Sequence, residues 1–197
     1  QLDAAKAKES FPDTREFPLV VTRNLDLARR WLWARSNGDQ NKRCGLVSTS
    51  EDQRFRAYGI ENSTDFRMGY PFEKWFLAPP NDVRSSFALE VAASEFECQG
   101  LELDWVGVCW GGDLTPNETG TNWDYRKFRG NGWQNVRSEI EQVYLVNRYR
   151  VLLTRARSGM VIWVPIGSTN DSTRDPVRFE RVYEHLRRAG VPDLPSE

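Results

Sequence analysis

The fold is decided by a stretch close to the start of the chain, FPLVVTRNLDLARRWLWARSNGDQNKRCGLVST (residues 17–49). Its first apolar run, residues 17–22, is short and β-branched, which is typical of a strand. Asn24 then provides an N-cap for a helix over residues 25–36. A second apolar run, residues 44–49, predicts another buried strand. A strand, a helix and a second strand in this order predict the beginning of a parallel sheet.

The rest of the chain continues the alternation. Ser50 and Gln53 have the spacing of a capping box, which predicts a helix over residues 51–59. Residues 61–87 and 113–134 show no sustained period, and we expect both to be insertions. The later elements that we expect are strands over residues 89–96, 105–110 and 160–165, a helix over residues 138–157, and a last helix between the N-cap Asp175 and Gly190.

We therefore expect one α/β domain over residues 1–197, with insertions at about 61–87 and 113–134. Its mostly parallel sheet should be flanked by helices on both faces, because alternating strands and helices pack in this way. Functional groups in such folds gather just after the carboxyl ends of strands. The segments that follow the expected strands are therefore the first places to look for a site.

Composition excludes several classes of protein. The chain has 197 residues, of which 39% are hydrophobic and 28% charged, as is ordinary for a globular protein that folds in water. A net charge of -1 gives no overall attraction to phosphate, so any nucleic-acid contact must be local. Three cysteines without a CxxC pair and a single histidine do not suggest a zinc or disulfide framework. No apolar run is long enough to cross a membrane and the start lacks a secretion signal, so we expect a cytoplasmic protein.

The chain contains neither the P-loop pattern, GxxxxGK followed by Ser or Thr, nor GxGxxG. It does place cations at the end of the expected long helix, where Arg155 lies one heptad after Arg148 on the same stripe. One interpretation is that Arg155 and Arg157 satisfy the negative end of the helix dipole. The other is an arginine finger, which stabilises charge on a phosphoryl group that another domain presents.

Three segments carry a resemblance to a known family. LLTRARSGMVIWVP (residues 152–165) resembles helicase motif VI, and ASEFECQGLELDWVGVCW (residues 93–110) resembles motif V. GLVSTSEDQRFRAYG (residues 45–59) is similar to the motif IV region. Together they resemble the Schlafen-like DNA/RNA helicase domain family of bacterial proteins, and the likeness spans about residues 17–190. The resemblance implies the C-terminal, second RecA-like motor domain of a superfamily-one-type helicase, which lacks the P-loop itself.

The resemblance also implies roles for single residues. The implied nucleotide contacts are Arg155 as the arginine finger, Glu102 near the nucleotide sugar, Gly100, and Arg54 or Arg56 as a second arginine facing phosphate. Gln99 forms with Gly100 the turn that communicates with nucleic acid. Many relatives have lysine at the position of Gln99, and a neutral amide loses the charge assistance of a lysine contact to phosphate.

The implied cofactor is ATP with Mg²⁺, bound only in the full-length protein and not by this domain alone. The implied partners are an N-terminal P-loop RecA-like domain of the same protein and single-stranded DNA or RNA, with no membrane. The function that we expect is the second motor domain of an ATP-dependent helicase or translocase, inactive alone. A nucleotide-dependent switch or scaffold without unwinding activity, and a degenerate interaction module, stay open as alternatives.

Two further patterns have competing interpretations. NWDYRKFRGNGWQN (residues 122–135) mixes Arg126, Lys127 and Arg129 with aromatic residues, so this loop would either bind nucleic acid or be anchored to the surface by its rings. Glu95, Glu97, Glu102 and Asp104 would either hold the metal ion of a nuclease or form the polar side of a strand.

Cys98 and His185 are predicted to have no chemical role. Cys98 has neither a histidine nor a basic residue beside it, so we expect a small packing residue and not a nucleophile. His185 belongs to a charged helix, where we expect it to face solvent.

Overall fold

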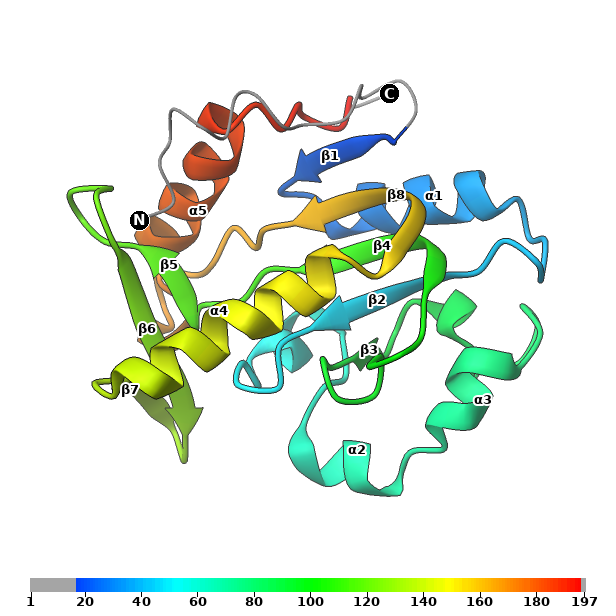
Figure 1. Ribbon diagram of the computed structural model, residues 1–197, viewed down its shortest axis with the longest axis horizontal. Coiled ribbons are helices and arrows are strands. Elements are labelled where there is room, and N and C mark those ends of the chain that lie inside the picture. Colours follow the sequence, from blue (N-terminus) through cyan, green and yellow to red (C-terminus); the bar gives the residue numbers. More distant parts are fainter. Residues whose placement is uncertain (1–16, 196–197) are drawn as a thin grey trace.

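The computed structural model describes residues 17–195, which form two sheets and the helices that cover them (Figure 1). Five strands form a parallel sheet in the order β1-β8-β4-β2-β3, and three form an antiparallel sheet in the order β5-β6-β7. The strands are β1 (Leu19–Thr22), β2 (Cys44–Ser48), β3 (Ala92–Ala93), β4 (Leu103–Cys109), β5 (Leu114–Pro116), β6 (Trp123–Arg129), β7 (Gly132–Asn135) and β8 (Ala156–Trp163). The prediction of an α/β fold with a mostly parallel sheet is confirmed.

The helices begin and end largely at the caps expected from the sequence. They are α1 (Leu25–Ser36), α2 (Thr64–Gly69), α3 (Phe72–Leu77), α4 (Glu139–Leu153) and α5 (Pro176–Arg188), with 3-10 turns η2 (Phe55–Tyr58), η3 (Ser86–Ala88) and η4 (Ser172–Arg174). Asn24 Oδ1 accepts a hydrogen bond from the Leu27 backbone N–H at 3.0 Å, and Asp175 caps α5 in the same way through Val177. None of these helices is long and apolar enough to cross a membrane.

Helices cover both faces of the parallel sheet, as predicted. Successive side chains of a strand point to opposite faces, so Val106 and Val108 of β4 belong to one core and Cys109 belongs to the other. The first core also contains apolar residues of α4 and α5, and the second contains Ala28 and Leu32 of α1. In Figure 1, α4 lies in front of the sheet and α1 behind it.

A glycine in the central strand allows α1 to approach closely. A Cβ atom on Gly107 would lie 2.7 Å from Leu46 Cδ2 and 2.9 Å from Leu32 Cδ1, which is closer than real Cβ contacts. The side chain of Leu32 therefore occupies the space that a larger residue at position 107 would need. The absence of a side chain at position 107 therefore allows α1 to pack closely on the sheet.

The segment expected as an insertion at about 113–134 contains most of the antiparallel sheet. β6 and β7 are joined by the two residues Gly130 and Asn131, and Gly130 has a φ of 60°, as a tight hairpin requires. The loop predicted over residues 122–135 is therefore wrong, because these residues form a hairpin. His185 of α5 does not simply face solvent either: its ring lies 4.8 Å from that of Trp123 in β6, and burial lowers its pKa.

The predicted helix over residues 51–59 is wrong, because its capping residue has a tertiary partner and the residues after it form a local turn. Ser50 Oγ donates to Glu95 Oε1 at 2.5 Å, and Asp52 Oδ1 accepts from the backbone N–H of Arg54 at 2.6 Å. Only the short turn η2 forms, and it ends at Gly59 with a φ of 76°.

Two other expected elements are shorter than predicted. The strand expected over residues 89–96 is reduced to Ala92–Ala93, because the Ser94 backbone N–H donates to Glu97 Oε2 at 2.7 Å and the chain turns there. α4 ends at Leu153, before Arg155 and Arg157, because the Thr154 hydroxyl and the Arg155 side chain bind its last carbonyls. Arg157 consequently belongs to β8 and not to the helix end.

Candidate functional site

Arg155 lies between α4 and β8, at the amino end of the parallel sheet. Its guanidinium donates from Nε to the carbonyl of Val151 at 3.0 Å, and from Nη1 to the carbonyls of Cys98 and Leu101 at 3.4 and 3.3 Å. Within residues 17–195 no carboxylate forms an ion pair with it. Arg155 therefore binds the carbonyl end of α4, as the helix-dipole interpretation expects, yet its charge is not neutralised.

Two of the carbonyls that Arg155 binds, those of Cys98 and Leu101, belong to the turn over residues 94–101. Gln99 and Gly100 are both exposed on this turn, and Gly100 has a φ of 79°, a backbone conformation that favours glycine. Glu102 follows directly, and its Oε2 accepts a hydrogen bond from Arg157 Nε at 2.8 Å. Both partners are largely exposed, so this ion pair is weak and readily exchanged. The structure thus brings Arg155, Glu102, Gly100 and Gln99 together.

Arg54 and Arg56 lie elsewhere. They follow the carboxyl end of β2, whereas Arg155 precedes β8, and these strands run parallel in one sheet. Arg54 Nη2 pairs with Asp171 at 2.8 Å, and Arg56 Nε pairs with Glu61 at 3.1 Å. Arg54 and Arg56, one of which is expected to be a second arginine facing phosphate, therefore lie at the carboxyl end of the parallel strands, opposite the end that carries Arg155.

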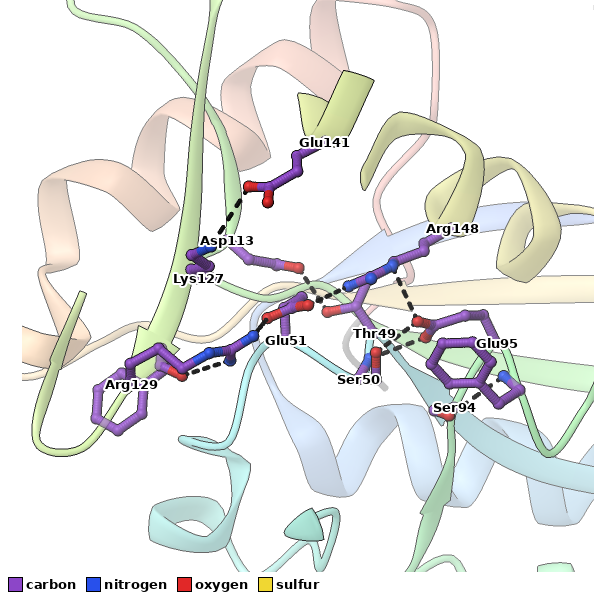
Figure 2. Close-up of polar contacts among 12 residues, drawn as sticks. Thr49, Ser50, Glu51, Ser94, Glu95, Asp113, Lys127, Arg129, Glu141 and Arg148 are labelled. Carbon is purple, nitrogen blue, oxygen red and sulfur yellow. Dashed lines mark hydrogen bonds and ion pairs between the residues drawn. The ribbon is translucent and has the colours of Figure 1, made fainter. Parts of the chain in front are cut away.

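A charged network joins the hairpin to α4 and to the turn over residues 94–101 (Figure 2). Glu51 pairs with Arg148 Nη1 at 2.6 Å and with Arg129 Nη2 at 2.8 Å, and Arg148 Nε also pairs with Glu95 at 3.1 Å. The Ser50 backbone N–H donates to the same Glu95 at 2.9 Å. Burial by itself would raise the pKa of Glu51, but the hydrogen bonds and charges of Arg148 and Arg129 lower it below its ordinary value.

Behind this network two aspartates are completely buried at the carboxyl ends of β2 and β4. Asp113 accepts from the Thr49 hydroxyl at 2.6 Å and from the Tyr149 hydroxyl at 2.7 Å. Asp52 accepts from the Gly112 backbone N–H at 2.7 Å. Burial, followed by the charge of Asp52, raises the pKa of Asp113 to about 7, and burial raises the pKa of Asp52 as well. Asp113 can therefore hold a proton at near-neutral pH.

The three cations predicted from residues 122–135 alternate along β6. Arg126 is only 8% exposed, donates from Nη2 to the Gly112 carbonyl at 2.6 Å and lies 4.7 Å from the Trp133 ring centroid. Lys127 and Arg129 point the other way and reach the surface, where Lys127 Nζ pairs with Glu141 at 3.3 Å. One cation therefore anchors the hairpin, and the other two are accessible to a ligand.

The four acids considered for a metal ion have separate partners. Glu95 pairs with Arg148, Glu97 with Arg67 and Glu102 with Arg157, while Asp104 accepts from the Arg43 backbone N–H. In the part of the chain that the structure describes, no group of three or more His, Cys, Asp or Glu side chains could hold a metal ion. Burial raises the pKa of Cys98 to about 12, which leaves it a protonated packing residue.

Sequence reasoning missed the Glu51–Arg148–Glu95 network and the buried aspartates. Two signals could have indicated them. Asp52 and Asp113 each follow an expected buried strand, and the carboxyl ends of neighbouring parallel strands meet at one edge. The two residues Gly130 and Asn131 between alternating segments are typical of a hairpin turn.

No curated protein and no solved structure matches this chain. One family does match: the family described as Schlafen group 3, DNA/RNA helicase domain, over residues 1–165. The matched range contains every strand from β1 to β8 and all three segments that carry the resemblance, and it leaves α5 outside. On the strength of this match over most of its length, the chain belongs to the Schlafen group 3 DNA/RNA helicase domain family.

Proposed function

We propose that this chain is the second, RecA-like motor domain of a superfamily-one-type, ATP-driven helicase or translocase. In this role it meets a nucleotide that a separate P-loop domain of the same protein holds. Membership of a helicase-domain family supports the general function, and a parallel five-stranded sheet covered on both faces agrees with a RecA-like fold. The observation that carries the proposal is the environment of Arg155.

Arg155 has the properties that an arginine finger needs. Its donors are held by neutral carbonyls, so the guanidinium is oriented without being neutralised. A phosphate oxygen forms shorter and stronger hydrogen bonds with a guanidinium than a carbonyl does. A phosphate that reaches this end of the sheet would therefore displace the carbonyls. A carboxylate partner, by contrast, would compete with the phosphate for the guanidinium. Arg157, by contrast, is already paired with Glu102.

ATP with Mg²⁺, held by the P-loop domain, would supply the phosphoryl group and the charge that develops on it. Arg155 would donate to the oxygens of that group and stabilise this charge. Glu102 would accept from a sugar hydroxyl once its exposed pair with Arg157 opens. Gly100 has no side chain to obstruct an approaching ligand, and nothing lies within 4 Å of the place where its Cβ would be.

The same contacts support coupling to nucleic acid. Cys98 and Leu101, whose carbonyls bind Arg155, lie on either side of Gln99 and Gly100 in the chain. When Arg155 leaves these carbonyls for a phosphate, the turn loses two of its hydrogen bonds. Gln99 would then contact a single strand differently in the two states. This coupling needs neither Arg54 nor Arg56, which lie at the carboxyl end of the parallel strands.

The test is ATP hydrolysis by the full-length protein, with and without single-stranded DNA or RNA. Arg155→Ala should lower the strand-stimulated rate roughly 10³- to 10⁵-fold while nucleotide still binds. Arg150→Ala is the matched control, because Arg150 is an exposed arginine in the last turn of the same helix. Equal rates in the wild type and in Arg155→Ala would limit Arg155 to its structural contacts with the three carbonyls.

One observation favours a second candidate, a nucleotide-dependent switch that does not translocate. Gln99 contributes no positive charge at the turn that would contact the strand, so this contact is weaker than a lysine would make it. Hydrolysis that depends on Arg155 but is indifferent to DNA and RNA would support the switch. Hydrolysis stimulated by a strand would support the motor.

A further inference from the structure

A pocket of about 310 Å³ lies between β6 and α4, on the side of the network drawn in Figure 2. Four cations line it, together with two carboxylates, Glu51 and Glu141. The cations are Arg126, Lys127, Arg129 and Arg148. The lining is therefore positive although the chain as a whole carries a net charge of -1. A concave surface of one sign concentrates ligands of the other sign, here anions.

Arg126 lines the pocket as part of β6, but its guanidinium lies on the opposite face of the hairpin from the side chains of Lys127 and Arg129. It is only 8% exposed and is held there by the Gly112 carbonyl and the Trp133 ring. The cations that an anion in the pocket would meet are therefore Lys127, Arg129 and Arg148.

Lys127, Arg129 and Arg148 meet two carboxylates in the pocket lining, and Arg148 also pairs with Glu95. Glu51 is shared by Arg129 and Arg148, and Lys127 has only the long contact of 3.3 Å with Glu141. Both Lys127 and Glu141 are partly exposed, so this pair is easily exchanged. In Figure 2 the two side chains reach toward each other from β6 and α4. A phosphate could replace Glu141 as the partner of Lys127 without breaking a buried ion pair.

Two exposed aromatic rings flank the pocket. Tyr144 lines it and is 59% exposed, and it precedes Arg148 by one helical turn on α4. Phe96 is 62% exposed, and the Arg148 guanidinium lies 5.9 Å from its ring centroid. Tyr144, Arg148 and Phe96 therefore follow one another along the surface. Exposed rings interleaved with cations are the surface on which single strands stack their bases.

We propose that this pocket binds a backbone phosphate of single-stranded nucleic acid, with neighbouring bases stacked on Tyr144 and Phe96. The inference rests on the proposed function for the kind of ligand, but it names a strand site apart from the Gln99 turn. Two rings on either side of one cation suit a strand better than a free nucleotide, which has a single base. Phe96 also begins the chain segment that leads to Gln99, so one strand could continue from the pocket to the turn.

The test is direct binding of a fluorescently labelled oligothymidylate, and of the matching oligouridylate, to the full chain, measured by anisotropy. Tyr144→Ala should weaken binding roughly 5- to 100-fold, the range that removal of a stacking ring gives. Val143→Ala should have no effect, because Val143 is similarly exposed on the same helix but does not line the pocket. Thermal melting of each variant verifies that it is folded.

Two further variants examine the phosphate contact itself. Lys127→Gln should reduce the slope of log Kd against log salt concentration by about 0.7, the value of one phosphate contact to a single strand. Glu141→Gln should tighten binding, because it removes the carboxylate that competes for Lys127 and keeps a residue suited to the capping box of α4.

Several outcomes would overturn the inference. One is equal affinity of Tyr144→Ala and Val143→Ala for the oligonucleotide, and another is an unchanged salt slope in Lys127→Gln. Displacement of the strand by ATP at the same phosphate concentration would assign the pocket to a mononucleotide instead. No binding of either oligonucleotide by the wild-type chain would also refute the site. The proposed function is judged separately, by the effect of Arg155→Ala on hydrolysis.

Discussion

Replacing Asp113 with asparagine should remove a pH dependence of stability that the wild-type chain carries. Asp113 is completely buried, and its two oxygens accept hydrogen bonds from Thr49 and Tyr149. Burial and the nearby charge of Asp52 raise its pKa to about 7, from an ordinary value of 3.8. Asparagine has nearly the same shape and can still accept from Tyr149, but it does not titrate near neutral pH.

The size and sign of the effect follow from linkage. Between about pH 4 and pH 7 the folded chain keeps the Asp113 proton and the unfolded chain has lost it. The folded state therefore binds more protons in this window, and the free energy of unfolding falls as pH rises. At about 1.4 kcal/mol for each tenfold change in proton affinity, the loss is about 4 kcal/mol over the whole window. Most of it, about 3 kcal/mol, falls between about pH 5 and pH 8.

The assay is urea unfolding of the wild type and Asp113→Asn at several values between about pH 5 and pH 8. The useful quantity is the difference in unfolding free energy between the two proteins, because the titration of other groups largely cancels in it. His185 is one such group: burial and the charge of Arg188 lower its pKa, so its own contribution to stability rises with pH. The unfolding free energy of the variant, relative to that of the wild type, should rise by about 3 kcal/mol across this range. A difference that stays constant would refute the raised pKa of Asp113.

Three other predictions concern folding stability, each measured by urea or thermal unfolding. Gly111→Ala would place a Cβ 2.6 Å from an oxygen of each buried aspartate and should cost about 2–3 kcal/mol; a loss below about 0.5 kcal/mol would mean that the site relaxes freely. Arg148→Ala leaves Glu95 buried without its cation and should cost about 3–5 kcal/mol, part of which Glu95→Gln in the same chain should restore. Asn24→Ala removes the N-cap of α1 and should cost about 1 kcal/mol, whereas an unchanged stability would contradict the cap.

Local signals predicted the elements whose determinants are local. Asn24 caps α1 and Asp175 caps α5 as expected, because each cap bonds a backbone N–H two or three residues away. The apolar runs of β2, β4 and β8 are buried on both faces of a parallel sheet, which such runs are typical of. The same reasoning placed Arg155 and Glu102 on segments that do meet.

The errors occur where a distant residue decides the outcome. Ser50 has the spacing of a capping residue, but Glu95 supplies a better partner across the fold. Arg126, Lys127 and Arg129 look equivalent in the sequence, yet the alternation of β6 buries the first and exposes the others. The meeting of Asp52 with Asp113 depends on the order of strands in the sheet, which the linear pattern does not determine.

α4 connects the two ends of the proposed mechanism. Arg148 and Arg155 are one heptad apart, and both hold the turn over residues 94–101, the first through Glu95 and the second through the carbonyls of Cys98 and Leu101. Near its other end the helix contributes Tyr144 and Glu141 to the pocket beside β6. A helix of 15 residues spans about 22 Å and is stiff over that length. Arg155 lies just after this helix and binds its Val151 carbonyl, so a change at Arg155 that moves the helix would reach the turn and the strand pocket together.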